Sequence, residues 1–127
     1  MQHLQFETAW DKTLSAKDRH FIQEIFLETR ISASKENILF TPLWQAVNHQ
    51  GALLVTVLIH NFSTRALSFN DQTLLYLENG ETVAEYSFTL PQLNITGKTS
   101  MPWTFIFPAT RLNQQPLFEN GELVIPE

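Results

Sequence analysis

Cysteine is absent from the 127 residues, and the chain has only four glycines and eight Lys or Arg side chains. Without cysteine it cannot form a disulfide, a thiolate nucleophile or a cysteine metal site. Four scattered glycines cannot build the loops that cradle phosphate, which excludes the common nucleotide-binding motifs. The longest apolar stretch, residues 52–59, is far too short to cross a bilayer.

The distribution of charge argues against nucleic acid as a partner. Residues 37–127 hold three basic and seven acidic side chains, and residues 1–36 hold five and six. A nucleic-acid-binding domain normally presents a basic surface, which this chain lacks. The start of the chain has neither the basic nor the apolar segment of a secretory signal. We therefore expect a cytoplasmic protein, with a membrane-peripheral location left open.

The amino-terminal part of the chain has the pattern of a helix. Ser15 is followed three residues later by Asp18, as in a capping box, and four apolar residues then recur at helical spacing: Phe21, Ile22, Ile25 and Phe26. This predicts an amphipathic helix over residues 16–30, preceded by a short strand near residues 4–6. The apolar stripe must pack on something, either the domain's own sheet or a partner.

The remainder of the sequence reads as strands. Aromatic residues make up 12% of the chain, and turn residues separate apolar stretches. The Asn79-Gly80 and Asn120-Gly121 pairs are typical of two-residue hairpins. Alternation in residues 82–90 predicts a strand with one wet face, whereas residues 53–62 are apolar on both faces and should be central. The expected strands cover residues 38–48, 53–62, 66–69, 73–78, 82–90, 93–96, 100–108 and 122–125.

These elements predict one domain over residues 1–127. It is mainly β, an antiparallel, immunoglobulin-like β-sandwich over residues 37–127. An amino-terminal helical arm over residues 1–36, linked through residues 31–37, packs on it.

A search for catalytic chemistry finds little. The four histidines do not pair at metal-binding spacing, so no metal or cofactor is expected. His60 and Asp71 are the only plausible base and orienting acid in the β region, and no serine is singled out beside them. Glu78 and Glu81 flank a hairpin turn, where carboxylates are usually solvated. We assign no catalytic residue and expect a non-enzyme.

Several segments resemble a known family. They are Phe6–Asp11, Ile38–His49, Leu54–Asn61, Ser87–Pro91, Thr99–Pro108 and Phe118–Leu123. Together they are similar to the SLAP domain of Bacillus and related Firmicutes, named from the S-layer assembly protein of an accessory Sec system. The founding member of this family works with a dedicated Sec ATPase in exporting S-layer proteins. The resemblance therefore implies a partner-binding module, and it carries over no known catalytic residues.

The expected function is therefore protein interaction, as an adaptor or assembly factor for accessory Sec secretion or cell-surface assembly. Its partners would be a secretion ATPase or an export cargo. An open sheet edge or an aromatic patch would bind them, and the candidate residues are Trp44, Met101 and Trp103. Two alternatives stay open: a carbohydrate-binding module of the cell wall, with tryptophans stacked on sugars, and a homo-oligomeric structural protein.

Overall fold

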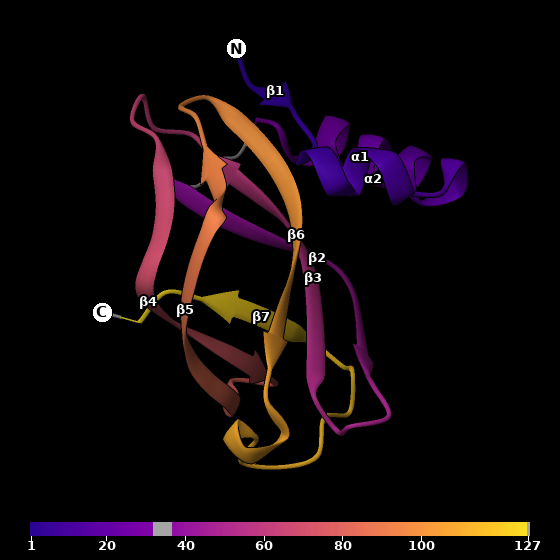
Figure 1. The fold of residues 1–127 in the computed structure, drawn as a ribbon, viewed down its shortest axis with the longest axis vertical. Coiled ribbons are helices and arrows are strands. Elements are labelled where there is room, and N and C mark those ends of the chain that lie inside the picture. Colours follow the sequence, from indigo (N-terminus) through magenta and orange to yellow (C-terminus); the bar gives the residue numbers. More distant parts are fainter. Residues whose placement is uncertain (32–36, 127) are drawn as a thin grey trace.

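The computed structural model describes residues 1–31 and 37–126. Two sheets pack face to face, and two helices lie against one of them (Figure 1). Sheet A has the order β1-β6-β3-β2, built from His3–Leu4, Thr99–Phe107, Leu53–Asn61 and Ile38–Val47. Sheet B has the order β5-β4-β7, built from Glu81–Ile95, Leu67–Glu78 and Gly121–Val124.

The predicted β-sandwich is confirmed. Strands are antiparallel except that β1 runs parallel to β6. Apart from β1, the first, second and fifth strands form sheet A, and the third, fourth and sixth form sheet B. Immunoglobulin-like folds divide their strands in the same way, with the strands lettered A, B and E in one sheet and those lettered C, C′ and F in the other.

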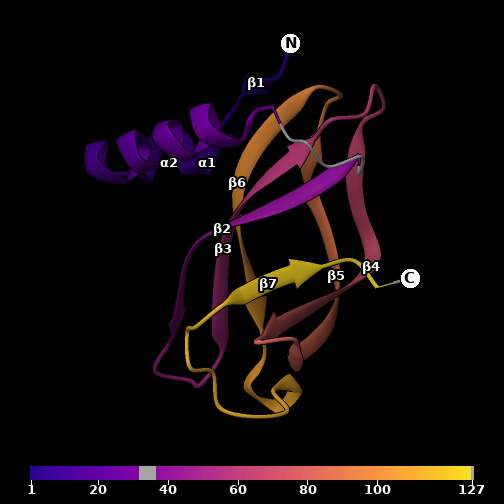
Figure 2. The same ribbon diagram turned by 180° about the vertical axis from the view of Figure 1, so that it is seen from behind.

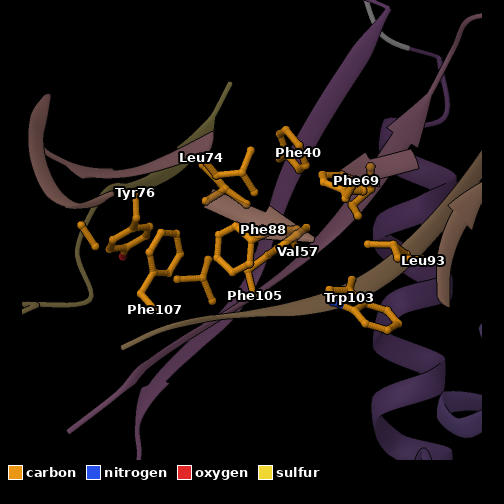
Figure 3. Close-up of a cluster of buried hydrophobic side chains, with 14 of the residues drawn as sticks. Phe40, Val57, Phe69, Leu74, Tyr76, Phe88, Leu93, Trp103, Phe105 and Phe107 are labelled. Carbon is orange, nitrogen blue, oxygen red and sulfur yellow. The ribbon is translucent and has the colours of Figure 1, made fainter. Parts of the chain in front are cut away.

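Phenylalanine rings fill the space between the sheets. The Phe105 ring of β6 lies 5.2 Å from that of Phe88, 5.5 Å from that of Phe69 and 6.1 Å from that of Phe40 (Figure 3). Tilted and edge-on contacts of this kind add to the hydrophobic stabilisation. Trp103, Phe105 and Phe107, which alternate along β6, all face this core.

Strand β3 is buried on both faces except at Leu54, which is half-buried, so its sequence predicted its central position correctly. Val55, Val57 and Ile59 point into the core between the sheets. Leu58 and His60, which alternate with them, point to the outer face of sheet A and are also fully buried. The helices cover this face at Leu58 and His60, which explains why both residues are buried there.

The helices are α1 (Thr8–Thr13) and α2 (Ala16–Thr29), and α2 begins where the capping box predicted. The Ser15 hydroxyl accepts a hydrogen bond from the Asp18 backbone N–H at 3.0 Å. Ile22 and Phe26 are buried against Leu58 of β3. The helix therefore packs on its own domain, and the alternative, that its apolar stripe serves only a partner, is wrong. Residues 32–36 of the predicted connection lie outside the described residues.

Two details of the strand prediction are wrong. Residues 66–69 and 73–78 are parts of one strand, β4, whose pairing shifts where Asp71 adopts a positive φ of 53°. Residues 82–90 and 93–96 likewise form the single strand β5, in which an irregular pairing accommodates Pro91. Bulges absorb residues that look like breaks in the sequence.

The two Asn-Gly pairs behave differently. Asn79 and Gly80 both have positive φ and join β4 to β5 in a tight hairpin. Asn120-Gly121 does not form the expected hairpin, because Gly121 begins β7 and pairs with Glu78 of β4. Tertiary pairing, not the local turn signal, decides the neighbour of this last strand.

Candidate functional site

The helices cover only part of the outer face of sheet A. Figure 1 and Figure 2 show both helices at one end of this sheet, and no helix lies over the other end. Beyond Leu58, toward the start of β3, the pairing of β2, β3 and β6 places six outer-face residues in two rows across the sheet. One row is Trp44, Thr56 and Thr104, and the next is Ala46, Leu54 and Ile106. We call these six residues the uncovered strip.

The uncovered strip is apolar and uncharged. Ile106 is 51% exposed, and Ala46 is also exposed. Trp44, Leu54 and Thr104 are half-buried, and Thr56, at 1% exposure, contributes almost no surface. The two threonines bond to each other, with 2.7 Å between their hydroxyl oxygens, so they offer little unsatisfied polarity. Exposed apolar side chains that gather on one face are candidates for protein–protein contact.

Trp44 owes its position to a β-bulge. The pairing of β2 with β3 slips by one residue between Pro42 and Trp44, so that Leu43 is the extra residue. As a result both Leu43 and Trp44 pack against the helix cluster. The Trp44 ring lies 6.2 Å from the ring of Phe21, a residue of α2 that is 39% exposed. This aromatic pair forms the helical rim of the uncovered strip.

A buried polar cluster on the same face is the nearest approach to a catalytic arrangement. His60 Nδ1 lies 2.6 Å from the Ser100 hydroxyl oxygen, and His60 Nε2 lies 2.8 Å from that of Thr29. The Thr29 hydroxyl donates its hydrogen to the Ile25 carbonyl, so it accepts a hydrogen bond from the Nε2–H group of His60. Nδ1 then accepts from Ser100, whose oxygen also accepts from the Gln2 amide at 3.0 Å. Every proton is accounted for with a neutral imidazole.

The surroundings keep that imidazole neutral. Burial lowers the pKa of His60 to about 4, because the charged form would lose its hydration. Its ring lies 5.1 Å from the Phe62 ring and 6.4 Å from the Phe26 ring. Both His60 and Ser100 have 0% exposure, so no substrate reaches the serine. The pair joins β3 and β6 to α2.

The structure does not bring together His60 and Asp71, the base and orienting acid considered from the sequence. Asp71 is exposed on sheet B, where its backbone N–H bonds the Thr89 hydroxyl. His60 belongs to sheet A and has hydroxyl partners instead. A histidine, an acid and a serine can be sought in a sequence, but their meeting depends on which sheet each strand joins.

The three predicted partner-binding residues are placed differently from one another. Met101 is 5% exposed and Trp103 is 9% exposed, and both pack into the core. Trp10 of α1 stacks on Trp103, with ring centroids 6.5 Å apart. Trp44 lies instead on the outer face, in the uncovered strip. Of the three, only Trp44 offers a partner more than a trace of surface.

The sequence of this chain matches one known protein family. Residues 4–124 match the SLAP domain family, which spans both sheets and the helices. The chain belongs to the SLAP domain family. The earlier resemblance is thereby confirmed. Curated proteins and solved structures gave no match. In the described residues of this SLAP domain, no helix has the length and apolar character needed to span a membrane.

Glu78 holds the last loop of the SLAP domain in place. Its carboxylate is 2% exposed and accepts hydrogen bonds from the backbone N–H groups of Leu117 and Phe118, each at 2.8 Å. The Tyr76 hydroxyl donates to it at 2.8 Å. Burial and this neighbouring carboxylate raise the pKa of Tyr76. The expectation of a solvated carboxylate at the hairpin tip is wrong for Glu78, since a loop distant in sequence covers it.

Sequence reasoning also missed Ile106 and Leu54 of the uncovered strip. A signal for Ile106 was available, because it alternates with Phe105 and Phe107 and so had to face away from the core. No such signal existed for Leu54. Its strand is apolar on both faces, and only the position of the helices leaves this residue uncovered.

Proposed function

We propose that this SLAP domain is a non-enzymatic protein-interaction module whose partner packs on the uncovered strip. The observation that supports this is the strip itself, an uncharged apolar surface next to the exposed aromatic Phe21 of the helical rim. The full burial of the Ser100–His60 pair supports the non-enzymatic part, because it is the arrangement closest to a nucleophile and base.

The family points to the setting in which the module acts. We propose a role as an adaptor or assembly factor for accessory Sec secretion or for assembly of S-layer and other cell-surface proteins. The partner would be a secretion ATPase or an export cargo, met in the cytoplasm or at the membrane periphery. A cell-wall carbohydrate is a weaker candidate, since Trp103 is buried and Trp10 stacks on it, leaving no flat platform of tryptophans.

Affinity capture tests this proposal. The tagged protein is recovered from its native cytosol after mild crosslinking, and bound proteins are identified by mass spectrometry. We expect the accessory Sec ATPase or an unfolded export cargo. Recovery of only the domain itself, or of unrelated cytosolic proteins, would contradict the proposed role.

A pair of variants connects the captured partner to the strip. Ile106→Lys places a charge on the uncovered strip, whereas Asn94→Lys places the same charge at an exposed position on β5 of sheet B. Burying an unpaired lysine in an interface is costly, so we expect Ile106→Lys to lose the partner and Asn94→Lys to keep it. Equal capture by the two variants would exclude the strip as the binding surface.

A further inference from the structure

One edge of sheet A is open beside the uncovered strip. Strand β6 pairs along its length with β3 on one side. On the other side β1 covers only Thr99 and Ser100. Among residues 1–31 and 37–126, no strand pairs with that side of β6 beyond Ser100.

The direction of the backbone groups at this edge follows from the pairing. The Gln5 N–H donates to the Ser100 carbonyl at 2.9 Å, so the backbone polar groups of Ser100 face the open edge. The register of β6 with β3 is unbroken from Thr99 to Phe107, so every second residue points its N–H and C=O the same way. Thr104 and Ile106 therefore present their backbone donors and acceptors to this edge.

The part of this edge nearest β1, around Pro102, is not available for pairing. Pro102 is the next residue after Ser100 whose backbone faces the open edge, and as a proline it has no N–H to donate. It is also buried, and Trp10 of α1 stacks on the neighbouring Trp103. The open segment is thus confined to Thr104–Phe107, about 13 Å of strand at the usual rise per residue.

A groove runs between this edge and strand β5, and its volume is about 560 Å³. Apolar and uncharged polar residues of both strands line it: Tyr86, Ser87, Phe88, Thr89, Leu90, Gln92, Trp103, Thr104, Phe105 and Ile106. Of the apolar ones, Tyr86, Leu90 and Ile106 supply the exposed surface, because Phe88, Trp103 and Phe105 are buried. No Asp, Glu, Lys or Arg is among the residues that line the groove. A ligand that fills it meets apolar side chains and uncharged hydrogen-bonding groups, and it gains no ion pair.

We infer that the open edge of β6 binds an extended, uncharged segment of a partner polypeptide by strand addition. The segment would bond to the backbone of Thr104 and Ile106, and every second side chain would enter the groove. Its other side chains would lie beside Ile106 on the uncovered strip. This inference rests on the proposed function and specifies how the partner is held.

A second copy of the chain fits the edge less well than a linear segment does. Stable dimers bury about 800 Å² on each subunit. Two antiparallel copies of β6 would meet over only a few residues, since Pro102 and Trp10 end the open segment. A short extended segment needs no more room than Thr104–Phe107 provides.

Nuclear magnetic resonance with a short peptide of alternating valine and serine tests the inference. The peptide carries no charge and is added at millimolar concentration. We expect amide hydrogen exchange to slow at least about tenfold at Thr104 and Ile106, because their N–H groups gain acceptors. The amide of Phe105 is the internal control, since it points toward β3 in the paired register and should not change.

Two N-methylated peptides are the matched control for strand addition. One carries the methyl groups on its valines and the other on its serines. Only one set of alternate amides can face β6, so one peptide should bind at least about tenfold more weakly while the other binds like the parent. Absence of binding by the parent, equal binding by both methylated peptides, or unchanged exchange at Thr104 and Ile106 would each overturn the inference.

This result is separable from the test of the proposed function. If the captured partner depends on Ile106 but leaves exchange at Thr104 and Ile106 unchanged, strand addition fails and the interaction role stands. If the peptide protects these amides but no secretion protein is captured, the edge binds strands and the proposed role fails.

Discussion

His60 is the residue whose chemistry is most altered by its surroundings. It accepts from Ser100 and donates to Thr29, and its ring lies beside the rings of Phe26 and Phe62. Protonation would place a charge on a ring that has 0% exposure to solvent and whose two nitrogens are already engaged. The folded state therefore binds this proton less readily than the unfolded chain does.

The consequence is a loss of stability in mild acid. The pKa of His60 falls from 6.5 when unfolded to about 4 when folded, so the unfolded state binds more protons between these values. The free energy of unfolding should fall by up to about 3 kcal/mol as the pH drops from 7 to 4. Urea unfolding at a series of pH values measures this loss.

The variant His60→Gln isolates the contribution of His60. Glutamine keeps hydrogen-bonding groups but does not titrate in this range, so the difference in unfolding free energy between wild type and variant should shrink as the pH falls. A difference that stays constant from pH 7 to pH 4 would show that His60 is not the group responsible.

Glu78 supports a second prediction at the scale of one side chain. Glu78→Gln replaces one carboxylate oxygen by an NH₂ group, which cannot accept a hydrogen bond, so either Leu117 or Phe118 loses its acceptor. We expect this change to lower the free energy of unfolding by about 1–3 kcal/mol. Glu81→Gln, at the exposed end of the same hairpin, should change it by less than about 0.5 kcal/mol. Chemical denaturation of both variants measures the contrast, and equal effects would contradict the structural role of Glu78.

At the scale of elements, α2 and the outer face of sheet A depend on each other. Ile22 is fully buried against Leu58, whereas Leu27 on the opposite side of the helix is 61% exposed. Ile22→Ala should cost about 2–5 kcal/mol of unfolding free energy. Leu27→Ala should cost less than about 0.5 kcal/mol. If thermal or urea unfolding shows the two variants to be alike, the helix does not pack as described.

Elements with local signals were predictable from the sequence. The Ser15 cap defines the start of α2, and Asn79-Gly80 defines the hairpin between β4 and β5. The continuity of β4 through Asp71 was not predictable. It depends on pairing with β5, which tolerates a bulge, and no local pattern distinguishes a bulge from a loop.

At the scale of the whole molecule, the sequence predicted the sandwich and its helical cover but only part of the candidate site. Trp44, Met101 and Trp103 are all large, apolar and near prolines, so composition could not separate them. Burial separates them in the structure. Met101 and Trp103 face the space between the sheets, while a bulge turns Trp44 toward the helices.

The uncovered strip itself is a property of the assembled fold. It exists because the helices end before the outer face of sheet A does (Figure 2). Its residues come from three strands, and β6 is far along the chain from the other two. The same assembly leaves the edge of β6 open, so the strip and the edge form one continuous surface around Ile106.

Site-specific photocrosslinking at Ile106 shows whether a partner binds at the uncovered strip. A photoreactive phenylalanine analogue replaces Ile106 in one protein and the exposed Asn94 of sheet B in another, and each is irradiated in a lysate of its native cells. We predict that position 106 crosslinks to a secretion ATPase or export cargo and that position 94 does not. Partner crosslinks that are equally strong at both positions, or that occur only at position 94, would contradict the account.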